Sequence, residues 1–155
     1  MTAPAPPSDD EKRLYYYGFP SQPKLVARSD AESTPWALET DGKPTPKCLD
    51  PVNRHPMVEL WDDSNGSLRR EVIRCSNGVK WNAIEIFRIG DCRLRWSHRR
   101  NDVPKPPVKL LISVDSDSLH WPQAWDIAKD CREVLQAHGL EDVHCEIRES
   151  RIMQL

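Results

Sequence analysis

Three acidic side chains have the types and positions that could bind a metal ion or transfer a proton. Asp115 and Asp117 directly follow the apolar run 108–114, and Glu149 ends the alternating run 143–149. Ligands of parallel α/β units bind beyond the carboxyl ends of the strands, so these three carboxylates are expected at one edge. They could hold Mg²⁺ or do acid–base work on a phosphoester. The same residue types also suit a turn and a helix cap, which require no catalysis.

A second group of candidate residues is an arginine-rich loop. The segment 91–107 carries basic side chains around a tryptophan, and its candidate binding residues are Arg93, Arg95, Trp96, Arg99 and Arg100. Arginines contact phosphates and tryptophan stacks on bases, so residues 93–105 could bind nucleic acid. A solvated charged loop and an acidic protein surface are the alternative interpretations.

An aromatic arm is the third candidate. Four aromatic residues lie within five positions, namely Tyr15, Tyr16, Tyr17 and Phe19. Such a segment is too apolar to remain in water, so we expect it to pack on the domain as an extended arm or to contact a partner. The partner would be another protein or a second copy of this chain.

Metal and cofactor sites are not indicated by the remaining motifs. The chain has five cysteines, and none of their spacings to each other or to histidine matches a closed structural zinc site. The sequence has no GxSxG, HExxH or GxGxxG motif. We therefore predict no metal and no cofactor, and catalysis is unsupported rather than excluded.

Composition limits the environment of the chain. The formal net charge is −2, which gives no overall attraction to nucleic acid or to an anionic membrane. No apolar run approaches the roughly 18 residues of a membrane span, and the N-terminus lacks the apolar core of a signal peptide. An odd number of cysteines without CxxC spacing favours buried thiols in a reducing compartment, so the cytosol or the nucleus is expected.

Periodicity predicts the elements that would position these residues. The predicted order is helix, strand, strand, helix, strand, over residues 57–75, 79–89, 108–114, 123–138 and 143–149. Asn65-Gly66 allows the first helix to be two helices with a break near 62–67. The fold class is α+β, with a small mixed sheet, a β-α-β unit over 108–149 and antiparallel pairing of 79–89 with 108–114.

The N-terminal half is predicted to be irregular. Residues 1–13 read as a disordered tail, and residues 14–155 as one α+β domain. Within it, residues 14–56 are expected to wrap the domain as an arm and a proline-rich coil, with a short strand over 24–27. The polar face of strand 143–149 is expected in solvent, with a functional site as the alternative.

Several strings resemble segments of uncharacterised proteins of filamentous fungi. They are residues 23–29, 80–85, 87–90 and 145–150. In those proteins a similar segment precedes other domains, some of them protease-like. The resemblance covers residues 20–150 and implies an N-terminal module of a eukaryotic intracellular protein. It assigns no active residue to this chain.

The function predicted from the sequence is a non-catalytic protein-interaction or accessory binding module. The aromatic arm and the proline-rich coil are the segments expected to contact a partner, and self-association is included. The first alternative is a metal-dependent hydrolase of phosphoesters that uses Asp115, Asp117 and Glu149. The second alternative is nucleic-acid binding through loop 93–105.

Overall fold

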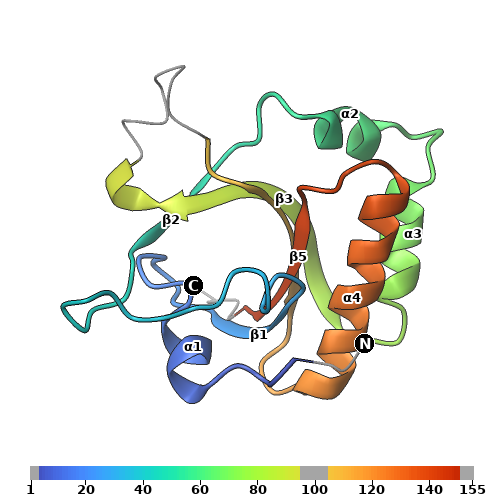
Figure 1. Ribbon diagram of the computed structural model, residues 1–155. Coiled ribbons are helices and arrows are strands. Elements are labelled where there is room, and N and C mark those ends of the chain that lie inside the picture. The colour runs from blue at the N-terminus through green and yellow to red at the C-terminus, as the bar shows by residue number, and fades with distance from the viewer. Residues whose placement is uncertain (1–3, 95–104, 151–155) are drawn as a thin grey trace.

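A five-stranded mixed sheet, in the strand order β1-β5-β4-β3-β2, is the framework of the protein (Figure 1). The computed structural model describes residues 4–94 and 105–150. Its strands are β1 (Lys24–Arg28), β2 (Lys47–Asp50), β3 (Trp81–Asp91), β4 (Val108–Val114) and β5 (His144–Glu149). Its helices are α1 (Asp9–Leu14), α2 (Pro56–Asp62), α3 (Leu68–Cys75), α4 (Trp121–Ala137) and the short 3-10 helix η1 (Cys92–Leu94). The predicted α+β fold is confirmed.

The two central strands form the predicted β-α-β unit. β4 and β5 pair in parallel, with Lys109 opposite His144 and Val114 opposite Glu149. A parallel pair needs a long crossover, and here the crossover contains α4. β3 pairs antiparallel with the other edge of β4, as predicted.

Helices α2, α3 and α4 cover one face of the sheet (Figure 1). The apolar residues of β4 alternate into this layer, where Leu110 and Ile112 meet Ala128 and Leu135 of α4. α2 and α3 are separate, as the Asn65-Gly66 break allows, because Gly66 N–H bonds to the carbonyl of Asp63 in a turn. This layer is the larger of the two cores.

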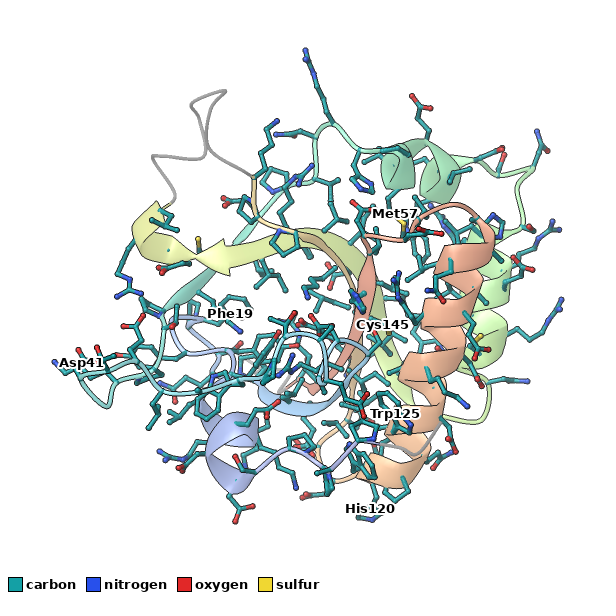
Figure 2. All side chains as sticks on the ribbon, in the orientation of Figure 1. Phe19, Asp41, Met57, His120, Trp125 and Cys145 are labelled. Atoms are coloured by element: carbon teal, nitrogen blue, oxygen red, sulfur yellow. The ribbon has the colours of Figure 1, made fainter. Side chains whose placement is uncertain are left out.

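A second, smaller core lies on the opposite face of the sheet. Its fully or largely buried members are Tyr15, Tyr16, Phe19, Leu25, Ile89 and Leu111. In Figure 2 the labelled Cys145 lies on the α4 side of β5, and the labelled Phe19 lies on the other side. The coil before β1 and the coil between β1 and β2 thus complete the covering of the sheet.

The N-terminal half is more regular than predicted, and two corrections follow. Residues 9–13 of the predicted disordered tail belong to α1, which Ser8 caps by accepting a hydrogen bond from Glu11 N–H at 3.1 Å. Glu11 also pairs with the buried guanidinium of Arg28, so a tertiary contact holds the helix. Within the coil, residues 47–50 form β2 at the edge of β3, and this pairing has no local sequence signal.

Candidate functional site

Charged side chains occupy the face of the sheet opposite α4. Side chains alternate along a strand, so Leu110 and Ile112 of β4 point toward the helices while Lys109 points away from them. On that second face the ammonium of Lys109 meets the carboxylates of Asp30 and Glu146. The alternation of β4 and β5 therefore brings a lysine and a glutamate together inside the protein.

Glu146 is the centre of this network, and its side chain is 0% exposed. The hydroxyl of Tyr15 donates to Oε2 at 2.6 Å and the hydroxyl of Tyr16 donates to Oε1 at 2.8 Å. Lys109 Nζ lies 3.5 Å from Oε2. Burial, followed by the negative charge of Glu146, raises the pKa of both tyrosines well above 10. The two hydroxyls therefore stay protonated and hold the carboxylate.

Asp30 connects two cations next to this centre. Its Oδ2 lies 2.5 Å from Lys109 Nζ, and its Oδ1 lies 3.1 Å from the guanidinium of Arg28. Arg28 also contacts Glu11 through Nε at 3.0 Å and donates to the carbonyl of Thr34 at 2.7 Å. Burial opposes ionisation of Asp30, but Lys109 and Arg28 outweigh it and hold its pKa below the usual value. Each of these carboxylates thus has a cationic partner.

Lys47 differs from the other cations of the network. Its half-buried ammonium lies 3.1 Å from the centroid of the Tyr15 ring. Among the residues that the structure describes, no carboxylate lies within 4.0 Å of this ammonium. Burial, reinforced by the charges of Arg28 and Lys109, lowers the pKa of Lys47 to about 8, although Glu146 opposes the change.

The backbone fixes the position of Lys47. Its N–H donates to the carbonyl of Tyr17 at 2.7 Å, which connects the aromatic arm to β2. The neighbouring Gly18 has φ +105°, and a Cβ there would lie 2.7 Å from the carbonyl oxygen of Lys47. Only glycine allows the two segments to approach this closely, so Gly18 is part of the support of the site.

A cavity of about 270 Å³ opens beside Lys47, and we name it the lysine cleft. Its charged lining consists of Arg28, Lys47, Lys109 and Asp30. Its apolar walls include Tyr15, Trp36, Ile89 and Pro107. Arg28 and Lys109 are already paired with carboxylates, so Lys47 is the cation of this lining that suits an anionic group attached to an apolar body.

The structure brings together two of the three predicted catalytic carboxylates. Asp117 donates its backbone N–H to Glu149 Oε1 at 3.3 Å, and both residues line a cavity of about 330 Å³ with Arg13 and Lys24. Asp115 is not in that lining, and its Oδ1 instead accepts a hydrogen bond from Asn82 at 3.2 Å. No group of three or more His, Cys, Asp or Glu residues in the described part of the chain could hold a metal ion.

The aromatic arm is divided between the interior and the surface. Tyr15, Tyr16 and Phe19 are buried in the second core, and Tyr15 also forms a wall of the lysine cleft. Tyr17 is 45% exposed and is the member of the arm that a partner can reach.

The arginine-rich loop is described only in its first part. Arg93 forms ion pairs with Asp91 and with Glu39, so its guanidinium is bound within the chain. The other predicted binding residues, Arg95, Trp96, Arg99 and Arg100, lie outside the described residues. Nucleic-acid binding through this loop stays a prediction.

Sequence reasoning missed the charged residues of the lysine cleft and identified only Tyr15 of its walls. The polar face of β5 was expected in solvent, but Glu146 is buried under the aromatic arm. One signal in the sequence was available, because Lys109 interrupts the otherwise almost wholly apolar strand 108–114. A lysine in a strand covered on both faces requires buried acidic partners, which Asp30 and Glu146 supply.

Comparisons with protein-family models, curated proteins and solved structures find no match to this chain. The resemblance to a filamentous-fungal module therefore stays a prediction. In the described part of the chain no helix has the length and apolar character that crossing a membrane requires. The charged and apolar lining of the lysine cleft is the structural feature that bears on function.

Proposed function

We propose that this protein is a non-catalytic binding module and that the lysine cleft takes a small organic anion, a carboxylate or a monophosphate with an apolar body. The observation that carries the proposal is the placement of the Lys47 ammonium, which lies in the cleft with no carboxylate within 4.0 Å among the described residues. This is the accessory-binding form of the function predicted from the sequence.

The charge arrangement supports an anionic ligand. Glu146 and Asp30 are already neutralised by Lys109 and Arg28, so neither carboxylate is available to Lys47 without breaking another pair. A partly desolvated ammonium without a counter-ion is unfavourable, and an entering anion would relieve that cost. Because the anion would be shielded from water by the cleft walls, its attraction to Lys47 would exceed that of a surface ion pair.

The walls and the size of the cleft support a small ligand. Tyr15 and Trp36 offer aromatic surface, while Thr34 and Thr45 add polar residues to the lining. The volume of about 270 Å³ lies just below the range of roughly 300–1,000 Å³ for drug-sized ligand pockets. A single ring that carries one acidic group is of suitable size.

Thermal melting with matched probes tests this proposal. Benzoate and phenyl phosphate, each at 10 mM, are compared with the neutral benzamide at equal ionic strength. A dissociation constant of about 1 mM stabilises the folded state by about 1.4 kcal/mol, which raises Tm by roughly 3–5 °C in a domain of this size. Lys47→Met should abolish the increase, and Lys43→Met, at an exposed position of the preceding turn, should preserve it.

Three results would contradict an anion-binding cleft. The first is the absence of any increase in Tm with either anion in the unchanged protein. The second is an equal increase in the Lys47→Met variant, because the anion would then bind elsewhere. The third is an increase with benzamide equal to that with benzoate, because the aromatic walls would then act without the ammonium.

The predicted location in the cytosol or nucleus is part of the proposal. No disulfide joins any of the five cysteines in the described part of the chain, and Cys131 and Cys145 are buried in the helix-covered core. Thiols of this kind suit a reducing compartment. A fluorescent fusion expressed in a eukaryotic cell is expected outside the secretory pathway, and its secretion would contradict the assignment.

A further inference from the structure

Three tryptophans form a groove at the N-terminal end of α4. Trp121 and Trp125 lie one helical turn apart, and their rings stack with centroids 6.4 Å apart and planes 14° apart. Trp36 comes from the coil after β1, and the three residues line one cavity of about 270 Å³. All three side chains are half-buried, so aromatic surface remains accessible in this tryptophan groove.

The N-terminal segment of the chain forms part of the wall of this groove. Pro4, Ala5, Pro6 and Pro7 line the same cavity as the three tryptophans. Figure 1 shows this dark-blue segment leaving α1 and running to the lower end of α4, where Figure 2 labels Trp125. A proline-rich stretch and an aromatic surface therefore face the same cavity.

The burial pattern of the segment has the period of a polyproline II helix. Proline fixes its own φ, and each residue before a proline is restricted to extended conformations, so this stretch favours polyproline II. That helix has three residues per turn, which places Pro4 and Pro7 on the same face. Pro4 and Pro7 are the half-buried members, whereas Ala5 and Pro6 are exposed. The two half-buried positions are thus the outer prolines of a Pro-x-x-Pro unit.

We propose that the tryptophan groove is a recognition site for proline-rich segments with Pro-x-x-Pro spacing, and that residues 4–7 occupy it as an internal ligand. Aromatic-lined grooves bind preformed polyproline II segments because little chain entropy is lost on binding. A partner protein that carries such a segment would compete with residues 4–7. This site is separate from the lysine cleft, although Trp36 and Arg28 line both cavities.

Binding of a labelled peptide to a shortened chain tests the proposal. The probe is fluorescein-labelled TAPAPPSDD, which corresponds to residues 2–10, and the receptor lacks residues 2–7 but keeps the cap Ser8. Fluorescence anisotropy should show saturable binding. The intact chain should bind the peptide on the order of tenfold more weakly, because a tethered segment competes at a local concentration in the millimolar range.

Two peptide variants distinguish spacing from proline content. A peptide with Pro4→Ala and Pro7→Ala should lose binding, because it lacks both half-buried prolines. A peptide with Pro6→Ala should retain it, because Pro6 is exposed. Equal binding of the two variants, or no binding of the unchanged peptide to the shortened chain, would overturn the proposal.

Matched tryptophan variants locate the site on the receptor. Trp125→Ala should abolish peptide binding, and Trp81→Ala, a change at an exposed tryptophan of β3, should leave it unchanged. If the shortened chain does not fold, the full chain with Pro4→Ala and Pro7→Ala serves as receptor.

Sedimentation of the intact chain tests for another occupant. A dimer that disappears on removal of residues 2–7 would show that a second copy supplies the segment, and it would overturn the internal placement.

Discussion

Replacing Lys47 with methionine is expected to stabilise the protein at neutral pH. Methionine keeps the length and the apolar stem of the side chain but removes the ammonium from the cleft. Burial of that ammonium, with Arg28 and Lys109 nearby, lowers the pKa of Lys47 from its usual 10.5 to about 8. A lowered pKa for a base means that the folded state disfavours the charged form, so the charge destabilises the fold.

The magnitude follows from that change in pKa and from the aromatic contact. A fall from 10.5 to about 8 corresponds to about 3 kcal/mol of destabilisation of the charged form. The Tyr15 ring, 3.1 Å from the ammonium, offsets about 1 kcal/mol of this by a cation–π interaction. Solvent screening of the half-buried side chain reduces the remainder further. We expect the free energy of unfolding to increase by about 1–2 kcal/mol in Lys47→Met, with Tm higher by roughly 3–6 °C.

The effect must depend on pH with a definite sign. Below about pH 8 Lys47 is protonated in both the folded and the unfolded chain, so the destabilisation is fully present. Between about pH 8 and 10.5 the folded state releases its proton first, and the unchanged protein gains stability relative to the variant. Above about pH 10.5 both states carry neutral lysine, so the advantage of Lys47→Met should vanish.

Urea unfolding at pH 7, 9 and 10.5 measures this difference. Groups common to both proteins titrate equally, so the difference between the two chains isolates Lys47. Lys43→Met, at an exposed position, should change stability by less than about 0.5 kcal/mol at every pH. A pH-independent gain in Lys47→Met, or a loss of stability at pH 7, would refute the electrostatic account of the site.

Three further outcomes are expected. The affinity for benzoate should fall about tenfold for each pH unit above about 8, which is the pKa of Lys47. Titration calorimetry measures this affinity, and a constant value up to pH 10 would contradict the role of the ammonium. Glu146→Gln should lower the free energy of unfolding by about 3 kcal/mol, because a buried ion pair and a tyrosine hydrogen bond are broken together. A urea midpoint equal to that of the unchanged protein would contradict the buried network. Gly18→Ala should lower the free energy of unfolding by about 2–4 kcal/mol, because the added Cβ meets the backbone of Lys47. Gly42→Ala is also at positive φ but has no atom within 4 Å of the added Cβ, so it should lower this free energy by only about 1 kcal/mol. Equal losses in the two variants would show that the close approach at Gly18 is unimportant.

The sequence predicted the elements that depend on local patterns. The strand 108–114 has the predicted bounds, α4 differs from the predicted range by one or two residues at each end, and β5 begins one residue later than predicted and ends where predicted. β4 is a continuous apolar run, α4 has an apolar stripe along one face, and β5 alternates apolar and polar residues. The spacing of the apolar residues alone indicates which side chains of these segments are buried. The antiparallel pairing of β3 with β4 was also predicted and is confirmed.

The errors lie where distant contacts decide the structure. α1 is too short to be stable alone, and it is held by Glu11 against Arg28, seventeen residues away. β2 has no strand pattern of its own, and its formation depends on the open edge of β3. Glu146 was expected in solvent because its strand alternates, but two tyrosines 130 and 131 residues earlier in the chain cover it.

The sequence by itself thus determined the fold class, the β-α-β unit and which strand faces are apolar, because these depend on residue spacing. It also contained the Pro-x-x-Pro unit at residues 4–7, whose conformation proline fixes locally. Only the tertiary structure decided which charges are compensated. Desolvation and ion pairing depend on neighbours in space, so the pairing of Lys109 and the isolation of Lys47 follow from how the arm and the coil fold over the sheet.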